Sequence, residues 1–145
     1  MKTTEIISIY ELLSSAKINK VQDQGKIKIV KTVRKMKKIV DDFNSLVEDA
    51  REKLKGEKHD ELIEKASRWQ QEGNEVNLTD EEKLEINAYF SEYGSRIDEF
   101  VKEDAEKEHD LGIAKLNEEE FDGLISSNDW DVKTIIQIQE LICEE

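Results

Sequence analysis

The sequence predicts a mostly α-helical protein built around a long antiparallel helical hairpin, similar to a coiled coil, with additional short helices. Three observations predict it. The 145 residues include no proline, which long helices tolerate but turn-rich β folds do not. Charged residues make up 39% and hydrophobic residues 37%, as in a slender helical protein with much surface. Two segments also repeat apolar residues at alternating steps of three and four.

The first of these segments predicts a helix from about residue 24 to 54. Its apolar positions form an unbroken heptad seam, which is typical of helices that pack along their length. Basic residues near its end and Gly56 just beyond it indicate where it stops. The seam consists of Ile29, Val33, Met36, Val40, Phe43, Val47, Ala50 and Leu54.

The second segment begins with a strong start signal. The Thr79 hydroxyl can accept a hydrogen bond from the amide of Glu82, and the Glu82 side chain can accept one from the amide of Thr79. The helix that follows has a second seam of the same period, which we expect to pack against the first. This seam consists of Ile86, Phe90, Tyr93, Ile97 and Phe100.

Shorter helices complete the prediction, and we expect one domain over residues 1–145. Within it, residues 111–145 form a C-terminal subregion that packs on the hairpin. Residues 111–116 break the helical pattern and are compatible with a short extended segment, and Gly25 is interpreted as a breaker in the connection 19–25. The short helices are expected at about 3–15, 59–71, 117–126 and 131–143.

A strongly basic stretch lies in the first long helix, where residues 24–40 contain seven cations and no acid. One interpretation is a binding site for nucleic acid or an acidic partner. The other, which we favour, is pairing with the acidic end of the second long helix, which would set the register of the hairpin. The cations are Lys26, Lys28, Lys31, Arg34, Lys35, Lys37 and Lys38, and the acids begin with Asp98, Glu99 and Glu103 and continue to Asp110.

No arrangement of residues with catalytic chemistry is recognisable. His59 and His109 lie in charged sequence and are expected at the surface, without the spacing of a metal motif. Cys143 is followed by two glutamates, which disfavour a thiolate. We therefore expect no enzyme activity, no metal, no cofactor and no small-molecule substrate.

The net charge of −13 opposes binding to nucleic acids and to anionic membranes. No apolar run approaches the ~20 residues of a membrane span. A single cysteine is simplest to reconcile with a reducing compartment. Together these features favour a cytoplasmic protein that binds a protein partner or a second copy of itself.

Two stretches carry a resemblance: residues 32–43, a basic helix running into acids, and residues 116–145, a short acidic helix pair. Together they resemble small acidic helical proteins of tailed bacteriophages and prophages, most of them without an assigned function. The resemblance covers about half of the chain and transfers no site residues. It implies a non-catalytic role in virion structure or assembly, in the host cytoplasm or the virion. The alternatives are an acidic DNA mimic that inhibits a host nuclease or repressor, and a nucleic-acid-binding module that uses residues 26–38.

Overall fold

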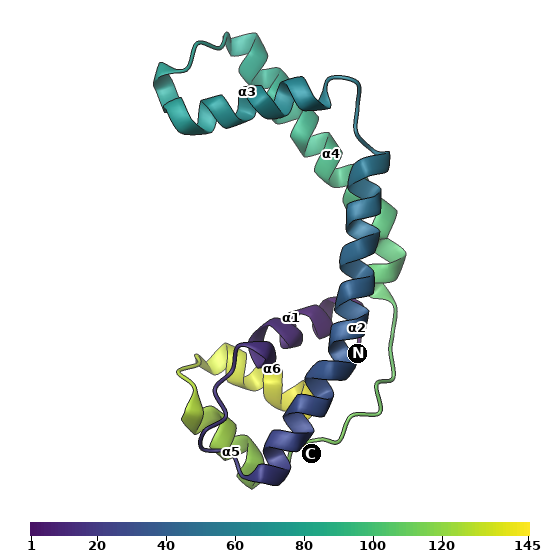
Figure 1. The fold of residues 1–145 in the computed structure, drawn as a ribbon, viewed down its shortest axis with the longest axis vertical. Helices are drawn as coiled ribbons and strands as arrows, with labels where there is room; N and C mark the ends of the chain where they lie inside the picture. The colour runs from purple at the N-terminus through teal and green to yellow at the C-terminus, as the bar shows by residue number, and fades with distance from the viewer. The chain divides into compact units, whose positions relative to one another are not determined.

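The computed structural model describes residues 1–145 and confirms the mostly α-helical fold class (Figure 1). Each predicted helix is present, with ends within a few residues of those expected. The elements are α1 (Thr3–Ser14), α2 (Asp23–Lys53), α3 (His59–Glu72), the 3-10 turn η1 (Gly73–Glu75), α4 (Asp80–Glu106), α5 (Glu118–Ser127) and α6 (Val132–Ile142).

The chain forms two compact units where the sequence predicted one domain. The first unit combines Met1–Asn44 with Asp104–Glu145, and the second is Ser45–Glu103. Residues 111–145 therefore belong to the same unit as the N-terminal 44 residues. The long helix α2 contributes residues to both units, because the boundary at residue 44 falls inside it.

The core of the first unit lies where α1, α5 and α6 gather beside the first part of α2 (Figure 1). Burial of this apolar surface is the main source of stability for short helices, which are marginal on their own. Ile6, Ile9, Leu124 and Ile138 are completely buried. The rest of the core is formed by Leu13, Val21, Ile29, Met36, Val40, Leu116, Phe121, Ile142 and Cys143.

The segment from residue 107 to 117 is not helical, as expected for the part around 111–116. Its last part lies beside the end of α6. The amide of Leu116 donates to the Ile142 carbonyl at 2.8 Å, and the amide of Glu144 donates to the Leu116 carbonyl at 2.8 Å. These two bonds form an isolated parallel bridge between Leu116 and Cys143, so the chain is extended at this point without forming a sheet.

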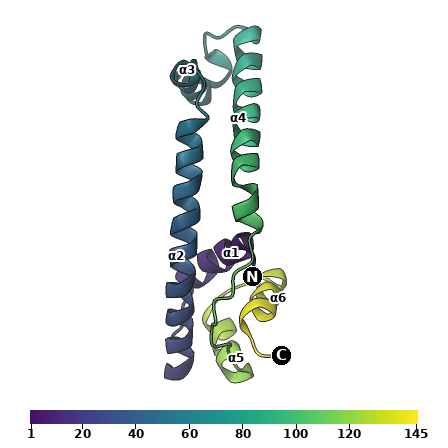
Figure 2. The same ribbon diagram turned by 90° about the vertical axis from the view of Figure 1, so that its right-hand side faces the viewer.

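In the second unit, α4 contacts α3 with its first half and the end of α2 with its second half (Figure 2). The Lys65 ammonium lies 3.1 Å from the Glu82 carboxylate, and the Tyr93 hydroxyl donates to the Arg51 carbonyl at 2.6 Å. The predicted start of α4 is confirmed. The Glu82 amide donates to the Thr79 hydroxyl and the Thr79 amide to the Glu82 carboxylate, both at 3.1 Å.

The first seam is divided between the two units. Ile29, Met36 and Val40 are buried in the core that includes the short helices, whereas Ala50 is buried in the second unit. A single heptad stripe thus packs against different elements along its length. The other members, Val33, Phe43, Val47 and Leu54, are half-buried.

The second seam departs from the prediction at its end. Ile86 and Ile97 are buried, and Phe90 and Tyr93 are half-buried. Phe100, however, is 44% exposed, and Val101 is buried in its place. A step of four from Ile97 keeps Val101 on the packed face, since a helix turns once in 3.6 residues. The Phe100 ring lies instead beneath the Lys53 ammonium, 5.8 Å from its centroid.

Gly25 does not break a helix, as the sequence suggested, but lies in the first turn of α2. A side chain there would meet its neighbours, because a Cβ atom would lie 2.6 Å from Cγ1 of Val21 and 3.1 Å from the Glu120 side chain. The glycine therefore allows α5 to approach the start of α2 closely.

Gly94 in α4 and Gly123 in α5 give a matched test of how closely α5 packs on its neighbours. We expect Gly94→Ala to raise the free energy of unfolding by about 1 kcal/mol, because alanine is the better helix former and its Cβ would meet no atom within 4 Å. Gly123→Ala should lower it by about 1–3 kcal/mol, because its Cβ would lie 2.6 Å from the Lys20 carbonyl oxygen. Urea unfolding followed by circular dichroism measures both. The reverse order of stabilities would contradict the packing of α5 described above.

Candidate functional site

The basic stretch of α2 finds partners in the first unit, mostly among residues 112–120. The Lys28 ammonium donates to the Glu120 carboxylate at 2.6 Å and to the Lys115 carbonyl at 3.3 Å. The Lys35 ammonium donates to the Gly112 carbonyl at 2.9 Å. Within α2, Lys37 pairs with Asp41 at 2.6 Å. Lys28 and Lys35 thus hold the non-helical segment and α5 against α2.

The expected pairing of this stretch with the acidic end of α4 stays a prediction. Asp98, Glu99 and Glu103 are exposed, and they belong to the second unit, whereas the basic stretch belongs to the first. The partners of Lys28 and Lys35 lie further along the chain, at Glu120 in α5 and at the Gly112 carbonyl in the non-helical segment.

Glu120 is the most constrained charged group of the first unit, with only 4% of its surface exposed. Its Oε1 accepts from Lys28 and, at 3.1 Å, from the Asn117 amide, while its own amide donates to Asn117 Oδ1 at 2.8 Å. The side chain therefore caps α5 and links it to α2. Its Oε2 is buried without a hydrogen-bond partner, and lies 3.1 Å from the position a Cβ would take on Gly25.

Opposing effects act on the pKa of Glu120. Burial raises the pKa, but the hydrogen bond and charge of Lys28 and the bond from the Asn117 amide outweigh it, so the pKa lies below its ordinary value of 4.5. The group is charged at neutral pH. Because its pKa is lower in the folded state than in the unfolded state, the stabilisation is present above the unfolded pKa. It is lost as the pH falls through the folded pKa.

Replacing Glu120 should therefore have a pH-dependent effect. We expect Glu120→Gln to lower the free energy of unfolding at pH 7 by about 1–3 kcal/mol, since it removes a charged hydrogen bond from a buried site. The difference from the unchanged protein should shrink as the pH falls below about 4.5. Urea unfolding at pH 7, 5 and 3 measures it. Asp41→Asn, which removes the exposed pair with Lys37, is the control and should change little.

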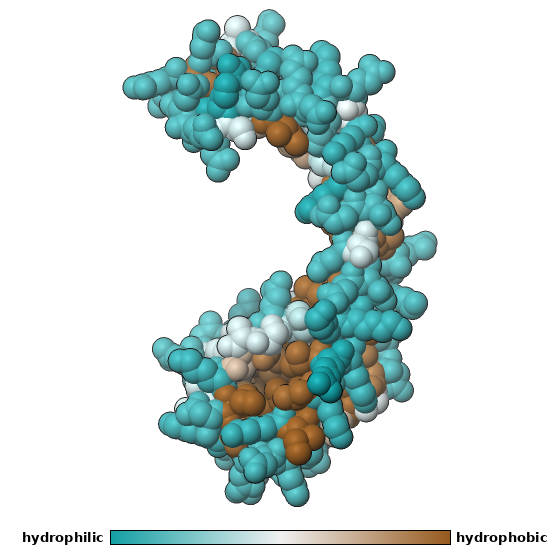
Figure 3. Space-filling view, in the orientation of Figure 1, coloured by the Kyte–Doolittle hydropathy of each residue, from teal (hydrophilic) through white to brown (hydrophobic).

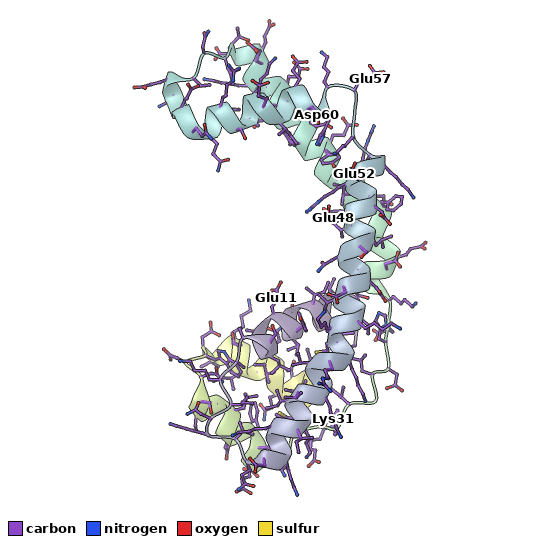
Figure 4. The ribbon with its side chains drawn as sticks, viewed as in Figure 1. Glu11, Lys31, Glu48, Glu52, Glu57 and Asp60 are labelled. Atoms are coloured by element: carbon purple, nitrogen blue, oxygen red, sulfur yellow. The ribbon has the colours of Figure 1, made fainter.

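The outer face of α2 in the first unit combines apolar and cationic side chains. Ile27 is 54% exposed and Val30 46% exposed. Lys31, Arg34 and Lys38 are exposed as well, and Figure 4 shows Lys31 on this part of α2. Ile27, Lys31, Arg34 and Lys38 follow at steps of four, three and four, so they share one stripe of the helix. This stripe is opposite the buried one formed by Ile29, Met36 and Val40. We call the stripe, together with the exposed Val30 at its edge, the α2 outer face.

A second exposed apolar pair lies on α6. Val132 is 72% exposed and Ile136 47% exposed, one helical turn apart, while Ile138 and Ile142 on the other side are buried. The helix begins firmly, because the Asp131 carboxylate accepts from the Thr134 amide at 2.8 Å. We call Val132 and Ile136 the α6 outer face. Figure 3 also shows apolar side chains gathered over the surface of this unit.

Neither outer face was found from the sequence. The heptad seam of α2 drew attention to its buried side, and Ile27 and Val30 fall between seam positions. The prediction of a helix at residues 131–143 did not assign its sides, and its large aliphatic residues are spread around the helix. The sequence did contain a signal for these faces, because both helices have apolar residues on more than one side. One core can bury only one side of such a helix.

Both histidines differ from the expected surface positions. His59 is only 5% exposed, and its Nδ1 lies 2.6 Å from the Tyr89 hydroxyl. The rings of Tyr89 and Tyr93 are stacked beside it, 5.8 Å apart. His109 is half-buried, with its Nε2 2.8 Å from the Thr3 hydroxyl. Charged neighbours along the chain misled the prediction, because adjacent residues face different sides of the backbone.

Two large hollows lie in the first unit and are open to solvent. One of about 570 Å³ is lined by residues around the start of α5 and the end of the chain, including Phe121, Asp122 and Glu144. Another of about 350 Å³ is lined by residues 109–113, Lys115, Glu140 and Leu141 together with Met1. No three His, Cys, Asp or Glu side chains are grouped so that they could hold a metal ion. None of the helices is both long and apolar enough to cross a membrane.

Cys143 is buried in the core of the first unit, with 6% of its surface exposed. Burial raises the pKa of its thiol to about 11 from an ordinary value of 9.0. The thiolate is the reactive form of cysteine, so the group is chemically quiet and serves as an apolar core residue.

Labelling of the thiol should report this burial. At pH 8, a shift of the pKa from 9.0 to about 11 lowers the thiolate fraction about a hundredfold. We expect an aromatic disulfide reagent to react with Cys143 at least that much more slowly in the native protein than in concentrated urea. The increase in absorbance of the released thiol measures both rates. Comparable rates would show that the end of the chain does not pack as described.

No known protein family, curated protein or solved structure matches this chain.

Proposed function

We propose that this chain is a non-catalytic helical interaction protein, encoded by a bacteriophage or prophage, that acts in virion structure or assembly. In this proposal it works in the host cytoplasm or the virion and binds a protein through the outer surfaces of its helices. The bacteriophage origin rests on the resemblance carried by residues 32–43 and 116–145.

The observation that supports a binding function is the pairing of exposed apolar side chains. Single exposed apolar residues are normal on soluble proteins, whereas adjacent ones mark interaction surfaces. Ile27 with Val30, and Val132 with Ile136, are each one turn apart on a helix and about half exposed or more. Such pairs are the usual anchors when one helix docks on another.

The chemistry of these faces favours a protein over a nucleic acid as the ligand. The cations of the α2 outer face are interleaved with Ile27 and Val30, which gain nothing from a phosphate backbone. Lys28 and Lys35 are already engaged with residues 112–120. The same exposed cations are a poor match for DNA mimicry, which needs carboxylates without interspersed positive charge.

Capture from a lysate of the source cell, induced for virion production, tests the proposal. We expect the tagged chain to retain a protein that mass spectrometry identifies as a virion component or one that folds with it. A variant with serine at Ile27, Val30, Val132 and Ile136 should lose that protein, because its helical anchors are gone. The control carries serine at Ile63 and Leu84, which are exposed apolar residues of the second unit.

Recovery of no such protein, or equal recovery by the variant, would contradict a role of these faces in assembly. The genes on either side of the coding sequence test the proposed origin separately. We expect capsid, portal or tail genes there.

A further inference from the structure

The α2 and α6 outer faces have opposite charge. Residues 24–40, which contain the α2 face, have seven cations and no acid. Residues 129–145, which contain the α6 face, have five acids and one cation. Around its apolar pair, the α2 face has mainly cations, with Asp23 one turn before Ile27. The α6 face has Asp129, Asp131 and Glu140 against a single cation, Lys133.

The two faces cannot meet within one chain. α2 and α6 contribute Ile29, Met36, Ile138 and Ile142 to the same core, and the outer residues of each helix lie on the side away from it. A contact between an α2 outer face and an α6 outer face therefore requires two molecules.

We propose that the α2 outer face of one copy of this chain docks on the α6 outer face of a second copy. Ile27 and Val30 would pack against Val132 and Ile136, in the manner of helices whose apolar ridges interdigitate. Around them, Lys31 and Arg34 would face the acids that flank α6, Asp129 and Glu140. These charges fix the orientation and speed the encounter more than they add affinity.

A symmetric contact of the α2 outer face with itself is disfavoured. Two α2 outer faces would place Lys31, Arg34 and Lys38 against the same cations of the partner, and like charges in an interface are costly. The proposed contact is heterologous, with different surfaces from the two copies. It leaves one free face on each copy, so further copies can add.

The contact is expected to be weak and dependent on concentration and salt. Two apolar pairs are few compared with a stable interface, which buries ~1,200–2,000 Å². The net charge of −13 also opposes association of whole molecules. Affinity in the micromolar range or weaker suits a subunit that assembles only when it is concentrated.

Light scattering after size-exclusion chromatography tests the proposal with the full chain. From micromolar to millimolar concentration at low salt, we expect the mass to rise above the 16.9 kDa of the monomer. The variants I27S/V30S and V132S/I136S should each stay monomeric, and I63S/L84S should associate like the unchanged protein. These positions are all exposed, and circular dichroism checks that each variant folds.

A one-to-one mixture of the two monomeric variants gives the decisive result. Each variant retains the face that the other lacks, so the mixture should form a dimer with one intact contact and grow no further. A monomer at every concentration, association unchanged in either variant, or no dimer in the mixture would each overturn the proposal. The proposed function is tested by capture of a different protein, so that proposal and the self-association proposed here can fail independently. Self-association would add a second copy of this chain to the partners of the proposed function.

Discussion

The close approach of α5 to the first turn of α2 governs the arrangement of the first unit. Gly123 of α5 leaves no room for a Cβ beside Lys20 and Val21, which lie just before α2. Gly25 likewise leaves no room for one beside the Glu120 carboxylate. The pair of Glu120 with Lys28 is the single buried charge interaction that joins the C-terminal segment to α2. Removing one member of such a pair costs more than forming it gains, because the other charge is left in a dry site. The pair therefore specifies where α5 lies more than it adds stability.

This contact determines which elements pack against each part of α2. The short helices α1, α5 and α6 gather on one side of the first part of α2. They cover its buried stripe of Ile29, Met36 and Val40. The later turns of the same helix, near Ala50 and Arg51, contact α4. One continuous helix with one heptad stripe thus contributes to both units. The unbroken stripe explains why the sequence predicted that α2 packs against a single partner helix along its whole length.

The same arrangement leaves two surfaces of opposite character on the first unit. A helix that buries one stripe exposes the opposite one, and in α2 and α6 that opposite stripe contains large aliphatic residues. Hydrophobic surface of this kind is usually kept for a partner, since leaving it in water costs free energy. The chemistry of the second unit is different. Its buried His59 and the stacked Tyr89 and Tyr93 pack the start of α3 on α4.

The sequence by itself determined the helices, their approximate ends, and the cap at Thr79, because these depend on propensity, periodicity and local hydrogen bonds. It also indicated that Cys143 is not a thiolate, which agrees with the raised pKa of the thiol, although the structure attributes this to burial. Only the tertiary structure decided which element each stripe packs against, the burial of His59, the exposure of Phe100 and the partner of Lys28. These depend on contacts between residues up to 92 positions apart. Periodicity shows that a face is apolar, but the path of the whole chain decides what covers it.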